Sequence, residues 1–305
     1  MGFARNAGCF VTGASGFLGR QVVVGLRQTS PALRVRCLVR DRSAMPLDGN
    51  VELIQGDLCD ERALERGTQG CEAVVHLAGA THEQDPSVYT QVNEEGTRRV
   101  VGAAKRAGIR RFVFASSRAI DGPCGAYGAS KRRAERLLID SRLPYIILRF
   151  AEVYGVGARG GLATLVHLVR TWPVVPVVYG VELAPVEIHD AVQAVLASLV
   201  TDGVEGKTYT IAGPRSYALE ECARLIADAL GVRRLYLPVP AATLWCFARL
   251  AIWTGGGRIV TDQVERLLCK KGADITQAVE ELGFRPRPFC DGVRPWCQTF
   301  GGRRS

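Results

Sequence analysis

The sequence predicts a doubly wound α/β fold, in which a parallel sheet carries helices on both faces and a smaller second part is attached. Six short apolar segments recur through the first half of the chain, and helical patterns separate them. Each segment is apolar at nearly every position, as strands buried on both faces of a parallel sheet must be. Strands and helices that alternate in this way are typical of right-handed crossover connections.

The first 150 residues contain all six segments and are expected to form the first domain. The predicted strands are residues 8–13, 35–40, 51–56, 73–79, 111–117 and 144–150. The predicted helices between them are residues 17–27, 60–66, 88–107 and 127–141.

The pattern is less regular after residue 150. Helices are predicted at 162–171, 188–201, 218–230, 241–252 and 275–282, with a proline-rich turn after the first of them and a strand at 207–213. We expect residues 188–213 to return to the sheet, and residues 151–187 and 214–305 to form a smaller, discontinuous C-terminal lobe. Because no linker separates the two parts, they should share one cleft.

The composition excludes several classes of protein. The 305 residues are 47% hydrophobic and 23% charged, without repeats or low-complexity segments, which indicates a globular chain. The first twelve residues leave no room for a signal peptide, and no apolar run approaches the roughly 20 residues that span a bilayer. We therefore expect a cytoplasmic protein without a membrane span. Residues 244–253 (LWCFARLAIW) could rest on a membrane surface, but a helix packed inside the lobe is the favoured interpretation.

Cysteines and charge give further expectations. The ten cysteines are scattered and include no CxxC pair, so we expect reduced thiols that act mostly as small apolar core groups. No group of His, Cys and Asp has the spacing of metal ligands, so no metal is expected. The formal net charge of +9 comes without a nucleic-acid-binding motif, so we expect no nucleic-acid partner. A small ligand with phosphate groups would suit a positive cleft.

Three glycines lie between the first predicted strand and the first predicted helix. Gly13, Gly16 and Gly19 belong to the stretch VTGASGFLG. The first permits a tight turn, the second lets the backbone approach a pyrophosphate, and the third allows the helix to pack closely on the strand. The N-terminus of the helix can then bind the anion. This arrangement predicts a Rossmann-type dinucleotide-binding domain over residues 1–150.

The residues after the second strand indicate which dinucleotide is bound. Arg40, Asp41 and Arg42 follow the end of that strand. Proteins that bind NAD usually place a carboxylate there for the ribose hydroxyls, whereas a guanidinium can pair with the 2′-phosphate of NADP. NADP is therefore favoured over NAD, with an inward-turned Asp41 as the alternative. Asp57, after the third strand, could accept a hydrogen bond from the adenine amino group, cap the following helix, or do both.

A second motif, YGASK, has the residues of a proton-transfer site. Tyr127 and Lys131 are four residues apart, so a helix places them on one face. A tyrosine hydroxyl has a pKa of about 10, and a neighbouring ammonium lowers it far enough for acid/base chemistry at neutral pH. Ser116 and Ser117 end the fifth strand, at the edge of the sheet where ligands bind. A serine there could hold the substrate oxygen.

These motifs together resemble one family. VTGASGFLG, GDLCD, HLAGA, NEEGT, FASS and YGASK occur in the order of the extended short-chain dehydrogenase/reductase family, and the later LRFAEVYG and IHD are also similar to it. The resemblance covers almost the whole chain. It implies that Ser117, Tyr127 and Lys131 form the catalytic trio, with Tyr127 as the acid/base and Lys131 also holding the nicotinamide ribose.

The resemblance also implies how the cofactor passes along the sheet. Leu77, Ala78 and Gly79 would lie beside it, and Asn93 would steady the site. With the glycine turn and the strand ends, the expected cofactor contacts are Gly13, Ser15, Gly16, Phe17, Leu18, Gly19, Arg40, Arg42, Asp57, Leu58, Leu77, Ala78, Gly79, Asn93, Ser116, Tyr127 and Lys131.

Two features depart from the family pattern. Tyr127 follows Ser117 by only 10 residues, where the family usually has a longer loop that helps to bind substrate. Glu152 stands where nucleotide-sugar enzymes often have an asparagine near the diphosphate, and it would repel a diphosphate unless it is paired or turned away. Arg149 or Arg159 could pair with it, although Arg149 could equally be a buried strand-end arginine.

Histidine chemistry is not expected in the site. His76 on the fourth strand is interpreted as a hydrogen-bonded histidine of the core or of the cleft edge. His189 and Asp190 are adjacent, but they are interpreted as the start of a helix beside the cleft and not as an acid/base pair.

The leading functional hypothesis is an NAD(P)-dependent oxidoreductase or epimerase that transfers a hydride at a carbinol or ketone carbon of a nucleotide-linked sugar. The short loop, Glu152 and residues 244–253 favour instead an NADP-dependent reductase or dehydrogenase of an apolar steroid, isoprenoid or lipid. A third hypothesis is a non-catalytic dinucleotide-binding regulator or assembly factor, against which the intact Tyr127 and Lys131 argue. The C-terminal lobe would bind the small-molecule substrate. The resemblance also implies a homodimer, because members of the family often pair through the helices that correspond to residues 88–107 and 127–141.

Overall fold

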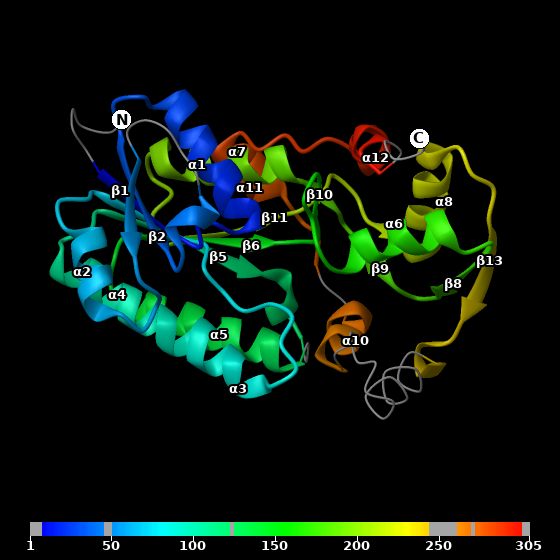
Figure 1. Cartoon of the computed structure of the whole chain (residues 1–305), viewed down its shortest axis with the longest axis horizontal. Coiled ribbons are helices and arrows are strands. Elements are labelled where there is room, and N and C mark those ends of the chain that lie inside the picture. The colour runs from blue at the N-terminus through cyan, green and yellow to red at the C-terminus, as the bar shows by residue number, and fades with distance from the viewer. Residues whose placement is uncertain (1–7, 46–50, 123–124, 244–260, 270–271, 301–305) are drawn as a thin grey trace.

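The computed structural model describes residues 8–45, 51–122, 125–243, 261–269 and 272–300. Two parts of the molecule lie side by side along its longest axis, and the seven-stranded sheet runs through one of them (Figure 1). The smaller part carries short helices and three two-stranded sheets.

The central sheet is parallel throughout, in the order β11-β6-β5-β4-β1-β2-β3. Its strands are β1 (Gly8–Thr12), β2 (Arg34–Val39), β3 (Val51–Gln55), β4 (Ala73–His76), β5 (Arg111–Ser117), β6 (Tyr145–Phe150) and β11 (Lys207–Ile211). All six strands predicted in the first half lie in this sheet, and the predicted strand at 207–213 pairs with β6 at its edge. The Rossmann-type doubly wound fold is therefore confirmed.

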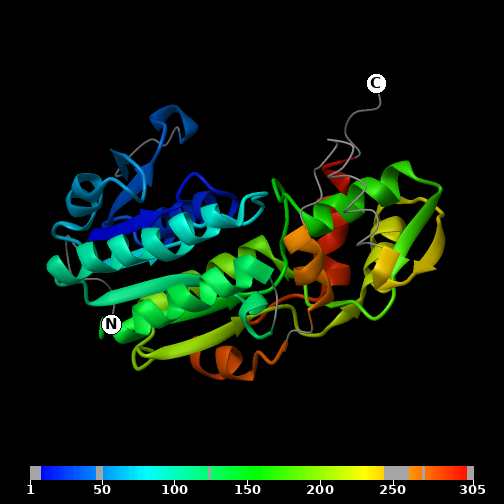
Figure 2. The same ribbon diagram turned by 90° about the horizontal axis from the view of Figure 1, so that it is seen from below.

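Helices cover both faces of the sheet (Figures 1 and 2). The helices α1 (Phe17–Thr29), α7 (Ile188–Val200) and α11 (Thr276–Leu282) lie on one face, and α2 (Glu61–Thr68), α4 (Gly96–Arg106) and α5 (Gly125–Asp140) lie on the other. Neighbouring residues of one strand belong to different cores: Val11 packs towards α1, and Phe10 packs towards α2 and α4. This alternation is why the strands are apolar at successive positions.

The predicted helix at 88–107 has an irregular first half. It begins as α3 (Pro86–Tyr89), continues through a π-helical segment, η2 (Thr90–Glu95), and becomes α4. Asp85 caps the start by accepting a hydrogen bond from the backbone N–H of Ser87 at 2.8 Å. Wide π-helical turns are frequent at functional sites, and this one contains Asn93, a predicted site residue.

The second part of the molecule packs around its own core. Its helices are α6 (Gly161–Thr171), α8 (Leu219–Leu230), α10 (Thr261–Leu268) and α12 (Phe289–Gln298). Its strands pair as β7 (Val153–Tyr154) with β10 (Val186–Glu187), β9 (Glu182–Leu183) with β12 (Tyr217–Ala218), and β8 (Val174–Val178) with β13 (Leu235–Val239). The aromatic rings of Tyr154, Tyr217, Phe289 and Trp296 meet at its centre. We call this core the aromatic cluster.

Several elements of this part were not predicted. The two-residue strands are too short to show a period, and Pro295 inside α12 hides its helical pattern. Residues 188–200 and 207–211 do form the helix and strand expected there. The predicted helix at 241–252 lies outside the described residues beyond residue 243, as does the apolar segment 244–253.

The expectation that all cysteines are reduced is wrong for one of them. Cys269 is disulfide-bonded. The free cysteines of the described part include three that are buried around the sheet: Cys9, Cys37 and Cys71. In the same part of the chain, no helix has the length and apolar character needed to cross a membrane.

Candidate active site

The glycine turn packs tightly between β1 and the end of β4. Gly13 has a φ of 71°, and a Cβ there would come within 2.6 Å of the backbone nitrogen of Ala78. A Cβ on Gly19 would lie 2.1 Å from the carbonyl oxygen of Gly13. Any side chain at these two positions would push α1 away from the strand ends.

The first turn of α1 offers donors to an anion. Gly16 is the N-cap residue and supplies no side-chain acceptor, and the first turn contains no acidic residue. The first N–H groups of a helix have no partner within the helix, so those of Phe17, Leu18 and Gly19 suit a bound pyrophosphate. The residues of this turn therefore fit a dinucleotide.

The end of β2 carries exposed positive charge. Arg40 and Arg42 are both exposed, and Arg42 begins the short 3₁₀ turn η1 (Arg42–Ala44). The Asp41 carboxylate faces Ser43, from which it accepts hydrogen bonds from N–H at 2.9 Å and from Oγ at 2.7 Å. These bonds lower the pKa of Asp41. The Asp41 carboxylate is therefore already engaged by Ser43.

Asp57 has a local role that differs in detail from helix capping. Its Oδ1 accepts hydrogen bonds from the backbone N–H groups of Cys59 at 2.7 Å and Asp60 at 3.2 Å. The N-cap of α2 is Asp60, which accepts from the N–H of Ala63 at 3.0 Å. The N-cap therefore lies three residues after Asp57, the residue considered for this role from the sequence. Leu58 is buried in the core beneath the turn.

Asn93 ties the end of β4 to α5. Its Oδ1 accepts from the N–H of Ala80 at 2.8 Å, and its Nδ2 donates to the Ala80 carbonyl at 3.1 Å and to Ser130 Oγ at 2.9 Å. Ser130 Oγ in turn donates to the carbonyl of Tyr127 at 2.8 Å. The side chain is 1% exposed. A buried, fully bonded amide of this kind fixes the segment after β4 relative to the helix that carries Tyr127.

Lys131 lies beside the segment after β4. Its Nζ donates to the carbonyl of Ala115 at 2.9 Å and lies 4.9 Å from the centroid of the Phe114 ring. A Cβ on Gly79 would lie 3.1 Å from this Nζ and 3.1 Å from Asn93 Oδ1. Gly79 thus keeps the space above the ammonium open. The structure brings together three of the predicted residues here: Gly79, Asn93 and Lys131.

Burial lowers the pKa of Lys131. The side chain is 4% exposed, and burial lowers its pKa to about 8, against the opposing effect of the Glu135 carboxylate. The charged form is disfavoured because the ammonium is removed from water. A displaced pKa beside open space is typical of groups that take part in chemistry.

The two serines at the end of β5 differ in their surroundings. Ser117 Oγ accepts a hydrogen bond from the N–H of Ala119 at 3.1 Å and caps the 3₁₀ turn η3 (Arg118–Ile120). Ser116 Oγ is buried and has no hydrogen-bond partner in the described part of the chain. A buried hydroxyl without a partner is costly, so Ser116 suits a ligand that supplies one.

Tyr127 lies in the first turn of α5, one turn before Lys131. It is 7% exposed. Its ring meets that of Tyr89 edge-on, with centroids 5.8 Å apart. On α10 the guanidinium carbon of Arg266 lies 4.5 Å from the Tyr127 ring centroid. Sequence reasoning missed Arg266, because no motif links residue 266 to residue 127.

The histidines have structural partners. His76 is fully buried, with Thr12 Oγ1 2.6 Å from Nδ1 and Thr97 Oγ1 3.0 Å from Nε2. Burial, aided by the charge of Lys131, lowers the pKa of His76 to about 3, so it is neutral. Asp190 receives hydrogen bonds from the guanidinium of Arg287, and His189 has an exposed side chain. These contacts agree with the structural interpretation of all three residues.

The partner of Glu152 differs from the two arginines considered for it. Arg149 forms a bidentate pair with Glu135, at 3.0 and 2.7 Å. Glu152 instead forms an ion pair with Arg118, whose Nη1 lies 4.0 Å from Glu152 Oε2. Arg118 follows Ser117 directly, and the η3 turn directs its side chain inward, where it is 2% exposed. A residue's direction within a short turn cannot be read from the sequence.

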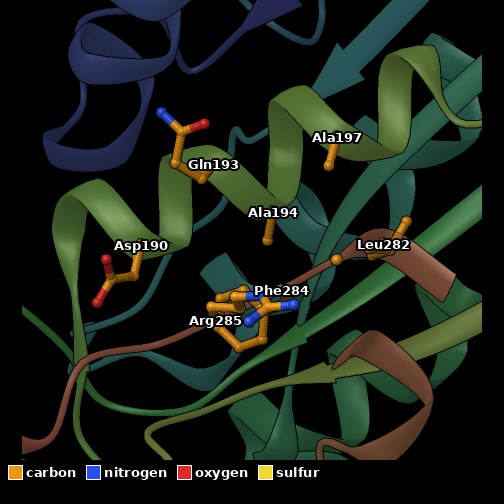
Figure 3. A pocket seen from close by; sticks show the side chains of 8 residues that line it. Asp190, Gln193, Ala194, Ala197, Leu282, Phe284 and Arg285 are labelled. Atoms are coloured by element: carbon orange, nitrogen blue, oxygen red, sulfur yellow. The ribbon is translucent and has the colours of Figure 1, made fainter. Parts of the chain in front are cut away.

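A separate hollow of about 230 Å³ lies on the outer side of α7, against the chain that follows α11 (Figure 3). It is lined by Asp190, Gln193, Ala194, Ala197, Leu282, Gly283, Phe284 and Arg285. None of the predicted site residues is among them. The candidate site is therefore the strand-end region described above.

Comparisons with known proteins find similarity over most of the chain. The family model described as the NAD dependent epimerase/dehydratase family matches residues 9–212. UDP-glucose 4-epimerase of Vibrio cholerae is 26% identical, over 95% of this chain and 94% of that protein. Ceramide reductase of Caulobacter vibrioides is 31% identical, over 75% of this chain and 73% of that protein.

A solved structure shares the fold. MoeE5 in complex with UDP-glucose and NAD superimposes with a TM-score of 0.76 at 23% identity, over 97% of this chain and 99% of that chain. The family model covers most of the chain, from β1 to the end of β11. The chain therefore belongs to the NAD dependent epimerase/dehydratase family, and it is an NAD(P)-dependent enzyme of the extended short-chain dehydrogenase/reductase type.

Proposed function

We propose that this enzyme transfers a hydride at a carbinol or ketone carbon, with Ser117, Tyr127 and Lys131 as its catalytic residues. The observation that carries the proposal is the position of Lys131, whose buried ammonium borders the space left by Gly79 and stands one helical turn from Tyr127. When bound, the nicotinamide would supply or accept the hydride. Residues 1–150 with 188–213 would hold the dinucleotide, and residues 151–187 and 214–305 would hold the substrate.

The proton is assigned to Tyr127. In the oxidative direction its phenolate accepts the proton of the substrate hydroxyl, while the hydride leaves the same carbon for the dinucleotide and a carbon–oxygen double bond forms. In the reductive direction the phenol returns that proton. The Lys131 ammonium favours the phenolate. Because Ser117 Oγ already accepts from Ala119 N–H, its own proton can be donated to the substrate oxygen.

The cofactor is proposed to be NADP(H). The support is at the end of β2, where Asp41 is engaged by Ser43 and Arg40 and Arg42 are exposed. A carboxylate that is already bonded is a poor acceptor for ribose hydroxyls, and free guanidinium groups suit a 2′-phosphate.

A nucleotide-linked sugar is the first substrate class proposed. Glu152 would repel a diphosphate if its charge stood alone, but Arg118 lies 4.0 Å from it and balances part of that charge. The similarity to UDP-glucose 4-epimerase over nearly the whole of both chains supports the same class.

An apolar hydroxyl or ketone is the second class, and one observation favours it. Arg118 is 2% exposed and faces Glu152, so it is a poor ligand for a substrate diphosphate. The relative named ceramide reductase is 31% identical to this chain, which supports this class. The two classes therefore differ in whether a phosphate must be bound near Glu152.

Turnover decides between the classes. The purified enzyme would be assayed with NADP(H) and NAD(H) against a panel of nucleotide sugars and a panel of apolar alcohols and ketones. Tyr127→Phe should lower kcat by about a thousandfold or more on the active panel, with cofactor affinity within about threefold of wild type. Cofactor binding without turnover on either panel, unchanged in Tyr127→Phe, would contradict the proposal and support a non-catalytic role.

Calorimetric titration tests the cofactor. We expect NADPH to bind more tightly than NADH, and Arg40→Ala to weaken NADPH about tenfold or more while leaving NADH unchanged. Arg34→Ala, at the other end of β2, is the matched control and should change neither. Equal affinity for both dinucleotides in wild type would contradict the proposed role of Arg40.

A further inference from the structure

Tyr127 has charged and aromatic neighbours from several elements. Its ring lies in a small apolar cluster with Ala80, Tyr89 and Ala119, against which Cys269 packs. The guanidinium carbon of Arg266 lies 4.5 Å from its ring centroid. The helix that carries Arg266, α10, packs against α5, and Figure 2 shows it at the junction of the two parts of the molecule.

The contact between Arg266 and the ring changes in strength when Tyr127 ionises. A guanidinium over a neutral tyrosine ring is attracted only by the ring quadrupole. Over a phenolate, the same cation faces a full negative charge shared between the oxygen and the ring, and the attraction between two charges is stronger. Arg266 therefore favours the ionised form of Tyr127, which is the form that accepts the substrate proton.

Without Arg266, only Lys131 would stabilise the Tyr127 phenolate, and it could do so only over a limited pH range. Its ammonium is buried, donates to the carbonyl of Ala115 at 2.9 Å, and has a pKa of about 8. Above that pH the group is increasingly neutral and loses its effect on the phenolate. A guanidinium keeps its charge at any pH at which the protein is folded.

The other charged groups on the surrounding elements have partners. Around the first turn of α5, the titratable and charged groups are Lys131 on α5 itself, Tyr89 on α3, Glu94 on η2, Arg118 on η3, and Glu265 and Arg266 on α10. Glu94 is paired with Arg133, and Arg118 faces Glu152. Of these groups, Arg266 is the cation that lies over the Tyr127 ring.

We propose that Arg266 is a positioning residue for Tyr127, and that its guanidinium, held over the ring by α10, stabilises the phenolate and sets the pH range in which the enzyme transfers protons. The inference rests on the proposed role of Tyr127. It adds a contribution from the second part of the molecule to a site whose proposed catalytic residues come from the sheet and α5.

The first test needs no substrate. The ultraviolet absorbance of tyrosinate would be titrated with pH in the presence of NADP, and the Tyr127 signal isolated by subtracting the Tyr127→Phe titration. In Arg266→Met, which keeps the length of the side chain but removes the charge, the midpoint should rise by about one pH unit. Arg266→Lys should restore most of the shift.

The matched control is Arg224→Met. The guanidinium carbon of Arg224 lies 4.8 Å from the centroid of the Tyr236 ring on the outside of the second part, so the same type of contact is removed away from the site. It should leave the Tyr127 midpoint unchanged. A midpoint in Arg266→Met equal to that of wild type would overturn the inference.

A kinetic test follows once the active substrate panel is known. The kcat/KM of oxidation by Arg266→Met should fall about tenfold on the acidic side of the profile and approach the wild-type value at alkaline pH, where the phenolate forms without help. A uniform loss across the profile would indicate a packing role and overturn the inference. Because the absorbance test needs no turnover, failure of the proposed reaction on both panels remains distinguishable from failure of the Arg266 assignment.

Discussion

The interiors of the two parts of this enzyme are stabilised by different kinds of contact. Around the candidate active site, buried polar groups bond one another, as Asn93 does with Ala80 and Ser130. In the second part, aromatic rings pack edge-on, and the buried hydroxyl of Tyr154 has no hydrogen-bond partner in the described part of the chain. Directional bonds fix a geometry, whereas packing tolerates changes of shape. The difference would suit the proposed division of the chain, in which the sheet holds the dinucleotide and the second part holds the substrate.

The largest loss of stability is expected at the glycine turn, where two backbone segments are in close contact. In Gly19→Ala the new Cβ would lie 2.1 Å from the carbonyl oxygen of Gly13, and neither group can move without separating α1 from β1. We expect the free energy of unfolding to fall by more than about 4 kcal/mol, measured by urea denaturation. Gly102→Ala is the control, because its Cβ would meet nothing closer than 3.5 Å, and it should stabilise α4 slightly. Equal stability of the two variants would contradict the close packing of the turn.

The second test applies the same change to the aromatic cluster. A Cβ on Gly292 would lie 2.0 Å from the hydroxyl oxygen of Tyr154, so Gly292→Ala should cost about 3 kcal/mol of stability. Here the obstacle is a side chain, and Tyr154→Phe removes its closest atom.

Tyr154→Phe by itself should be neutral or stabilising, because the hydroxyl is buried without a partner. The double variant should recover a large part of the loss in a thermodynamic cycle. Strictly additive losses would show that the second part is as rigid as the first and would remove the contrast between them.

The third test uses pH. Lys131 has a usual pKa of 10.5, and burial in the folded protein lowers it to about 8. Between these values the unfolded chain binds a proton that the folded chain does not, so the free energy of unfolding rises with pH. The rise contributed by Lys131 is up to about 3 kcal/mol.

Lys131→Met lacks this contribution. The stability of wild type relative to Lys131→Met should therefore increase from pH 8 to pH 10.5, in denaturation curves recorded along that range. The stability of Lys105→Met, a change at an exposed position on α4, should vary with pH in the same way as that of wild type. A constant difference between wild type and Lys131→Met would mean that the ammonium is solvated in the folded protein.

The smallest effect is expected from Asn93→Ala. The substitution leaves the N–H and carbonyl of Ala80 and the hydroxyl of Ser130 without their partner, which should cost about 2 kcal/mol. NADP affinity, measured by calorimetry, should also weaken, because the segment at Leu77 to Gly79 loses its anchor. Asn93→Ala with wild-type NADP affinity would show that this network serves stability alone.

The sequence predicts the sheet well because its signals are local. Each of the six apolar runs and the glycine turn can be recognised within about ten residues of sequence. The strands lie where the apolar runs are. Tyr127 and Lys131 could likewise be placed on one face of a helix from their spacing alone.

The second part is predicted less well because its contacts join distant segments. The strands β7 and β10 have two residues each and form only by pairing with each other. The pairing of Arg118 with Glu152, and the place of Arg266 over Tyr127, depend on how turns and helices meet in space. Arg149, one of two arginines considered as a partner of Glu152, pairs with Glu135 instead, and the reduced state expected for Cys269 is wrong.

The path of the chain has a mechanical consequence. It leaves the sheet after β6, returns with α7 and β11, leaves again for β12 and α8, and comes back to place α11 against β11 before α12 packs on α8. A force applied between the two ends would therefore load both parts at once and could not detach the second part as a separate unit. Single-molecule extension should accordingly show one cooperative rupture with a contour length close to that of the whole chain, and cutting the protein at one junction should not release an independently folded lobe.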